Sequence, residues 1–103
     1  MALELHGIEI PRAEVERFCA RNRIRKLSLF GSILTDRFRP GSDVDVLVEF
    51  EPGAPITYLD LARMERELSE VLGRKADLRT PAELSRYFRE RVVSEAIVQY
   101  ERD

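Results

Sequence analysis

The sequence has a single cysteine, Cys19, and no run of apolar residues long enough to cross a membrane. One cysteine excludes an internal disulfide and a zinc site built from cysteine ligands. A membrane-spanning helix needs ~18 consecutive apolar residues, and the amino terminus lacks the basic start and apolar core of an export signal. We therefore expect a cytoplasmic protein that does not contact a membrane and in which Cys19 is a buried structural thiol.

An excess of charge of one sign is also missing, because 17 Lys and Arg residues accompany 19 Asp and Glu residues, for a net charge of −2. A mildly acidic chain is poorly suited to tight, salt-sensitive binding of polynucleotides, so we expect no direct contact with nucleic acid. The one basic cluster, at residues 21–26, is more typical of a solvated helix end than of a binding patch. The length of 103 residues fits one domain, residues 1–103, with a small hydrophobic core.

Hydrophobic periodicity predicts three helices and three strands. The predicted helices cover residues 11–22, 57–72 and about 80–100, the last either continuous or broken near Ser85. The predicted strands cover residues 25–30, 44–50 and 75–79. Capping boxes begin at Thr57 and Thr80, and Gly73 is a suitable helix stop. The order helix, strand, strand, helix, strand, helix indicates an α+β (α/β-like) domain with helices packed on a short sheet. The apolar face of residues 84–100 is expected to pack on that sheet, with a partner interface as the alternative.

Two carboxylates, Asp43 and Asp45, stand at the head of the predicted strand 44–50. Because side chains alternate along a strand, both point to one face, with α-carbons ~6.5–7 Å apart. An Asp-x-Asp pair alone is more often a solvated turn, but this pair runs directly into an apolar strand, where an uncompensated charge is expensive. Mg²⁺ or Mn²⁺ suits such oxygen ligands. Two such ions can serve the attacking and leaving oxygens of an in-line displacement.

Two further elements extend this pattern into a candidate site. Asp77 completes a three-carboxylate site if its strand neighbours strand 44–50, and otherwise it is an exposed residue of an edge strand. Gly31 and Ser32 follow the strand 25–30, where glycine permits a close backbone approach and exposed N–H groups attract phosphate. An ordinary turn with Ser32 as a helix cap is the alternative for that pair. Together these residues predict a site for a nucleoside triphosphate and magnesium.

The order Gly31-Ser32, ten-residue spacer, Asp43-x-Asp45 and a distant Asp77 resembles the signature of the DNA polymerase β-type nucleotidyltransferase superfamily. Over about residues 11–100 the chain is similar to its minimal nucleotidyltransferase (MNT) branch, and the segments 38–53 and 72–78 are typical of that branch. The resemblance implies a short mixed sheet flanked by helices.

The same resemblance implies roles for the site residues. Asp43, Asp45 and Asp77 would ligate magnesium and be catalytic, with Asp77 helping to activate the acceptor hydroxyl. Gly31 and Ser32 would hold the triphosphate of ATP. Many relatives carry Arg or Lys at the position of Thr35. The nearest basic side chains here are Arg37 and Arg39, which either meet phosphate or are exposed loop residues.

Members of the MNT branch are commonly antitoxins encoded with a HEPN-domain ribonuclease toxin. The resemblance implies that AMP is transferred from ATP to a tyrosine of that toxin, which is thereby neutralised. Only 26 residues follow Asp77, so we expect no large acceptor-binding module and a partner protein that supplies the hydroxyl. Two alternatives stay open, namely an antitoxin that only binds and covers its toxin, and a transferase that acts on a small molecule.

Overall fold

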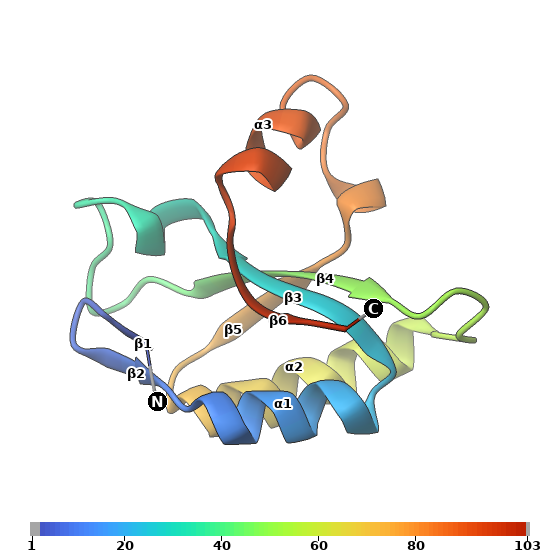
Figure 1. The fold of residues 1–103 in the computed structure, drawn as a ribbon. Coiled ribbons are helices and arrows are strands. Elements are labelled where there is room, and N and C mark those ends of the chain that lie inside the picture. The colour runs from blue at the N-terminus through green and yellow to red at the C-terminus, as the bar shows by residue number, and fades with distance from the viewer. Residues whose placement is uncertain (1–2, 103) are drawn as a thin grey trace.

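A four-stranded mixed sheet organises the computed structural model, which describes residues 3–102 (Figure 1). Its strand order is β5-β4-β3-β6, where β4 runs antiparallel to β3 and parallel to β5, and β6 runs antiparallel to β3. The strands are β3 (Ile24–Phe30), β4 (Val44–Phe50), β5 (Ala76–Arg79) and β6 (Ile97–Glu101). The helices are α1 (Arg12–Arg21), α2 (Tyr58–Leu72) and α3 (Arg89–Glu95). The predicted α+β class with a mixed sheet is confirmed.

Helices α1 and α2 cover one face of the sheet and enclose the hydrophobic core (Figure 1). Alternate residues of β4, namely Val44, Val46 and Val48, point into this core and are fully buried. Asp45 lies between two of them and is therefore on the opposite face, because successive side chains of a strand alternate. The core on one face thus directs the acidic residues to the other.

Local signals set the ends of α2 as predicted. The Thr57 hydroxyl accepts a hydrogen bond from the Asp60 N–H, and the Asp60 carboxylate accepts one from the Thr57 N–H, which completes a capping box. Gly73 ends the helix with a φ of 67°, a conformation that glycine adopts without strain. The helix also fixes the strand that follows it. The Ser69 hydroxyl and the Glu65 carboxylate accept hydrogen bonds from the N–H groups of Ala76 and Leu78, at 2.9 and 2.8 Å.

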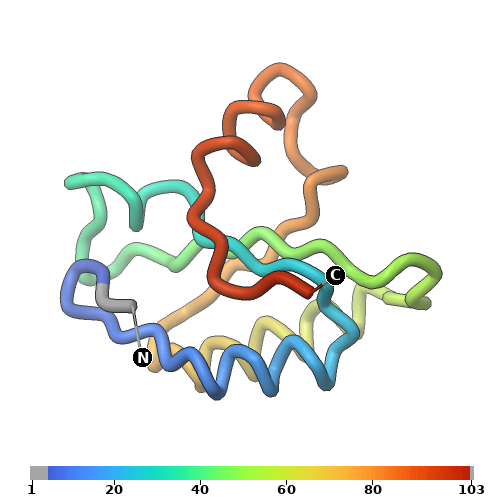
Figure 2. The backbone as a smooth tube through the Cα atoms, viewed as in Figure 1, coloured from blue at the N-terminus to red at the C-terminus, as the bar shows by residue number. Residues whose placement is uncertain are grey.

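The prediction of a helix over residues 80–100 is only partly right, because residues 89–95 are helical but residues 97–101 form a strand. After a 3₁₀ turn at Pro81–Glu83, the chain forms the short α3 and returns to the sheet as β6 (Figure 2). Ala96 has extended backbone angles that end α3, and the β-branched Ile97 and Val98 favour a strand. The apolar spacing of residues 97–100 is compatible with a helix, but these residues form a strand because β6 pairs with β3.

A small hairpin near the amino terminus was not predicted. Strands β1 (Leu3–Leu5) and β2 (Ile8–Ile10) pair antiparallel, and His6 and Gly7 form the turn with positive φ angles of 53° and 76°. Two positive φ angles are typical of a tight hairpin turn. Among the described residues, no helix combines the length and apolar character that crossing a membrane requires.

The reactivity of the Cys19 thiol provides a test of how tightly the core is packed. Its side chain is fully buried, as predicted, and burial raises the pKa of its thiol to about 12. We expect a thiol-reactive chromophore to label Cys19 only after denaturant unfolds the protein. Since the unfolded thiol ionises near its ordinary pKa of 9.0 and the folded thiol does not, the free energy of unfolding should fall as the pH rises above that value. Rapid labelling of the native protein would contradict this packing.

Candidate active site

The predicted site residues meet where three strand ends come together on the face that α1 and α2 leave open. Because β3 and β4 are antiparallel, the end of β3 lies beside the start of β4, with Phe30 opposite Asp45. Because β4 and β5 are parallel, Asp45 also lies opposite Asp77. The predicted adjacency of these two strands is therefore confirmed, and adjacent strands lie about 4.8 Å apart.

The Asp45 carboxyl is the electrostatic centre of this site. Its pKa is raised from the ordinary value by burial, and then by the Asp77 and Asp43 carboxylates. Arg79 and the nearby Ser32 backbone N–H lower it in part. A carboxyl whose pKa is raised by burial and by neighbouring carboxylates is typical of functional sites. The three predicted acidic residues therefore interact, although they come from separate parts of the chain.

Two cations hold the flanking carboxylates. Arg79 pairs with Asp77 through Nε to Oδ1 and Nη2 to Oδ2, both at 3.2 Å, and Lys75 Nζ lies 3.9 Å from Asp43 Oδ2. Within residues 3–102, no three acidic, histidine or cysteine side chains lie close enough to hold one metal ion. The three aspartates thus share a face without forming a closed ligand cluster.

The donor set nevertheless fits a divalent cation. All three side chains offer carboxylate oxygens, the ligands that Mg²⁺ and Mn²⁺ prefer. A cation near Asp45 would offset the repulsion from Asp43 and Asp77 that raises the pKa of its carboxyl. The competing ion pairs are partly exposed, and such pairs contribute only about 0–1 kcal/mol, so a metal ion can displace them.

Gly31 is required beside Asp45 for two separate reasons. Its φ is +79°, which strains any other residue type. A Cβ at this position would also overlap the Asp45 carboxylate oxygen Oδ2 and lie 3.1 Å from Asp45 Cγ. The close approach brings the 3₁₀ turn η1 (Gly31–Leu34), including the Ser32 N–H, against the acidic residues.

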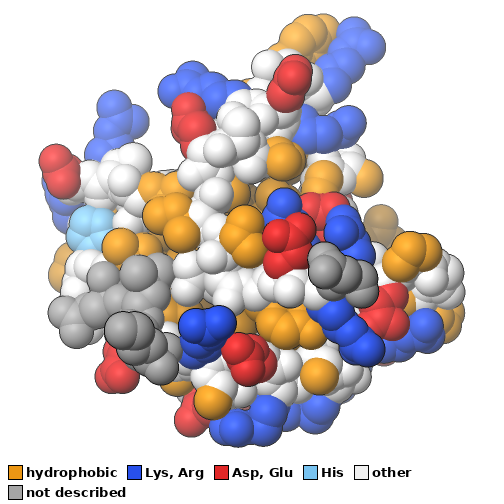
Figure 3. Space-filling model, in the orientation of Figure 1, with side chains coloured by type: hydrophobic (Ala, Val, Ile, Leu, Met, Phe, Trp, Pro, Cys, Tyr) orange, Lys and Arg blue, Asp and Glu red, His pale blue; other side chains and the backbone are white. Residues whose placement is uncertain are grey.

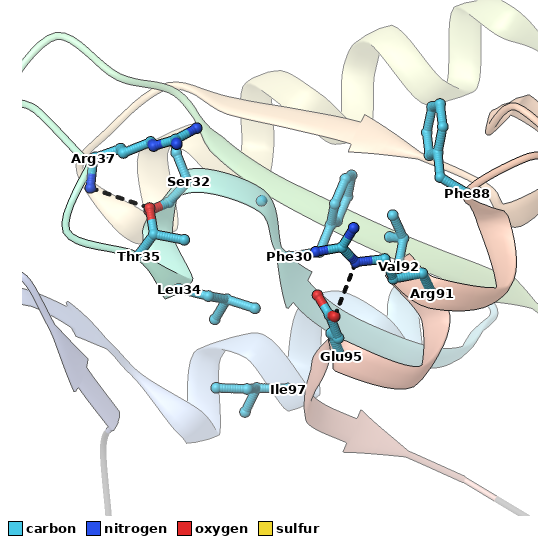
Figure 4. A pocket seen from close by; sticks show the side chains of 11 residues that line it. Phe30, Ser32, Leu34, Thr35, Arg37, Phe88, Arg91, Val92, Glu95 and Ile97 are labelled. Carbon is cyan, nitrogen blue, oxygen red and sulfur yellow. Dashed lines mark hydrogen bonds and ion pairs between the residues drawn. The ribbon is translucent and has the colours of Figure 1, made fainter.

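A pocket of about 760 Å³ opens on the other side of Gly31 and Ser32, between η1 and α3 (Figure 4). Its apolar wall is formed by Phe30, Leu34, Phe88, Val92 and Ile97. Its polar side chains are Ser32, Thr35, Arg37, Arg91 and Glu95, and Arg91 pairs with Glu95 at 3.1 Å. The volume is in the usual range for small-molecule sites. The contribution of α3 was missed, because the apolar spacing of residues 84–100 was assigned to packing on the sheet.

Residues 13–99 match the nucleotidyltransferase domain family. The chain belongs to this family. A Methanocaldococcus jannaschii protein, provisionally named a protein adenylyltransferase, is 35% identical over 77 residues, which are 75% of this chain and 81% of that protein. A solved structure provisionally described as a minimal nucleotidyltransferase is 38% identical with a TM-score of 0.69, over 84% of this chain and 86% of that one.

A solved complex of a tri-AMPylated Shewanella oneidensis HEPN toxin with an MNT antitoxin also matches this nucleotidyltransferase. The identity is 17% and the TM-score is 0.63, over 87% of this chain and 69% of that one. At this level of sequence identity, the similarity shows a shared fold and nothing more. The recognised resemblance is confirmed, and the family implies a nucleoside triphosphate substrate and a divalent metal ion.

The substitution Gly31→Ala tests the contact with Asp45. Gly53→Ala is a matched control, because Gly53 has a φ of +81° and no atom within 4 Å of an added Cβ. Both variants should lose about 1–2 kcal/mol of unfolding free energy from backbone strain. Only Gly31→Ala should also lose binding of ATP with Mg²⁺, measured by calorimetry. Equal ATP binding by the two variants would show that the contact is not needed.

The substitution Asp45→Asn tests the repulsion among the carboxylates. At neutral pH the ionised Asp45 lowers stability, because its folded pKa is raised. Removing the charge should raise the free energy of unfolding, measured by urea denaturation with a metal chelator present. As the pH falls toward the pKa of Asp45, the free energy of unfolding of the wild type should approach that of the variant. Asp36→Asn, in the exposed loop, should change neither quantity. A loss of stability in Asp45→Asn would contradict the prediction.

Proposed function

We propose that this nucleotidyltransferase moves AMP from ATP to a tyrosine hydroxyl of a partner HEPN-domain toxin and thereby neutralises the toxin. The observation that carries the proposal is the placement of Asp45 opposite Asp77 on the open sheet face, with Gly31 packed against the Asp45 carboxylate. This placement offers a metal-binding acidic pair next to a backbone turn that can approach phosphate closely.

Each element of the site has a part in the proposed reaction. The Gly31–Ser32 turn would hold the triphosphate, and the carboxylates of Asp43, Asp45 and Asp77 would be the ligands available to a divalent ion. Once bound, the ion would supply Lewis-acid polarisation of the phosphate. Asp77 is on the edge strand β5, where an acceptor can approach, and it takes the proton from the acceptor hydroxyl. The hydroxyl oxygen bonds to the α-phosphorus, the bond to the β-phosphate oxygen breaks, and pyrophosphate leaves.

A protein acceptor is supported by the relatives and by the surface. The S. oneidensis complex pairs an MNT antitoxin with an AMPylated toxin, and the M. jannaschii protein is provisionally named a protein adenylyltransferase. In this chain the segment after β5 exposes apolar side chains, among them Tyr87, Phe88 and Val93. Figure 3 shows apolar and charged side chains side by side on this part of the surface. Leu84 is the one large apolar side chain of residues 84–98 that is buried. Tyr100 also packs against the core, so the predicted packing of residues 84–100 holds at its two ends, while the exposed apolar side chains between them favour an interface.

AMP transfer can be tested with the HEPN-domain protein that the proposal expects to be encoded beside this chain. The two proteins are mixed with ATP and Mg²⁺, and the intact mass of the toxin is measured over time. We expect increments of one AMP unit, which a chelator abolishes and added Mg²⁺ or Mn²⁺ restores. Asp77→Asn should slow transfer by about 100-fold or more, as loss of a general base does. Asp36→Asn, an exposed loop carboxylate, should have no effect.

The same experiment separates the proposal from its alternatives. If the double variant Asp43→Asn, Asp45→Asn still neutralises the toxin at unchanged expression, the chain acts by binding alone. If no mass increment appears on a toxin that binds the intact chain, transfer to that protein is excluded. Transfer to a small hydroxyl compound without any protein partner would instead support a small-molecule transferase.

A further inference from the structure

We propose that Arg37 is the residue that binds the terminal phosphates of the nucleotide and that Arg39 serves only to shape its loop. The inference rests on the proposed function in taking the pocket beside Gly31 and Ser32 as the site of the triphosphate. It assigns a substrate contact that the sequence left open between the two arginines.

Arg37 has an uncommitted cationic group at the pocket. Its side chain lines the pocket together with Gly31, Ser32 and Thr35, and Figure 4 shows it extending along η1 on the side of Ser32. Within residues 3–102, no hydrogen bond or ion pair holds its guanidinium. A guanidinium binds phosphate oxygens through two parallel hydrogen bonds, which makes arginine well suited to a triphosphate.

The backbone of Arg37 is tied to the phosphate-binding turn by one hydroxyl. The Thr35 hydroxyl donates to the Ser32 carbonyl at 2.9 Å and accepts from the Arg37 N–H at 3.1 Å. These two bonds fix the start of the Arg37 side chain relative to Ser32. Thr35 thus positions the arginine that follows two residues later. A backbone already fixed at the turn loses less conformational entropy on binding.

Arg39, by contrast, is held within the loop. Its Nη1 donates to the Asp36 carbonyl at 2.9 Å, its N–H donates to the Ser42 hydroxyl at 3.0 Å, and its carbonyl accepts from Arg74 Nη2 at 2.8 Å. Between the two arginines, Phe38 is buried and its ring lies against Arg74, 4.7 Å from the guanidinium carbon. Arg39 does not line the pocket.

The remaining arginine of the pocket is already neutralised. Arg91 Nε pairs with the Glu95 carboxylate at 3.1 Å, so the two side chains together add no net charge to the pocket. Arg37 is thus the one pocket cation without an acidic partner among the described residues. In a nucleotidyltransferase, whose substrate is a nucleoside triphosphate, the anion that matches it is the end of the triphosphate chain.

The test compares ATP with AMP, each with Mg²⁺, in equilibrium binding to the intact chain. Arg37→Ala should weaken ATP binding by about tenfold or more, as loss of charge-assisted hydrogen bonds does, and leave AMP binding unchanged. Arg37→Lys should recover part of the ATP affinity. The matched control is Arg66→Ala, since Arg66 is an exposed arginine of α2 on the far face of the sheet. It should alter neither affinity.

The Thr35 tether gives a second, independent comparison. Thr35→Val removes the hydroxyl at nearly constant shape and should weaken ATP binding, whereas Thr35→Ser should keep it. In the Arg37→Ala background, Thr35→Val should cost no further affinity, because the two residues act through one contact. Thermal denaturation of each variant shows that it is folded.

Unchanged ATP affinity in Arg37→Ala, or an equal loss for AMP, would overturn the inference. Failure of the intact chain to bind ATP would overturn it together with the proposed function. If ATP binding depends on Arg37 but no AMP reaches the toxin, the Arg37 contact stands and the proposed function fails. If AMP transfer proceeds and Arg37→Ala leaves the KM for ATP unchanged, the proposed function stands and the Arg37 contact fails.

Discussion

The position of Asp77 depends on how α2 holds the edge strand β5. This strand pairs with a neighbour on one side only, and the N–H groups of Ala76 and Leu78 donate to the Ser69 and Glu65 side chains of α2. Those bonds, together with burial of Ala76 and Leu78, fix which residues face the core. A slip of one residue would turn Asp77 into the core. The acidic pair with Asp45 therefore rests on side chains that lie on the other face of the sheet.

The arrangement of charges around Asp45, which the proposed function needs, lowers the stability of the fold. Burial and two neighbouring carboxylates raise the pKa of Asp45. The turn can approach Asp45 only because Gly31 has no side chain. Arg79 and Lys75 offset part of the repulsion by pairing with Asp77 and Asp43. Since these pairs are partly exposed, they can exchange for a metal ion at small cost. The rest of the core supplies the stability that this arrangement removes.

Local patterns carried most of the site prediction. Alternating valines in β4 fixed the face of Asp45, and the capping box and Gly73 fixed α2, because these signals lie within a few residues of what they determine. The end of the chain could not be derived in this way, since β6 exists through pairing with β3, a partner some 70 residues away. The two loop arginines look alike in sequence. They differ because burial of Phe38 and the contacts of Arg74 hold Arg39 in the loop.

The strand order also gives the proposed reaction a direction. Asp77 is on the edge strand β5, Asp45 is on the adjacent β4, Gly31 follows β3, and the pocket continues toward β6 and α3. An in-line displacement needs the attacking and leaving oxygens on opposite sides of the phosphorus. With the reacting phosphate near Asp45, an acceptor arriving at the β5 edge faces a pyrophosphate that departs toward Gly31 and Arg37. The acceptor hydroxyl and the triphosphate then approach the reacting phosphorus from opposite ends of the strand order.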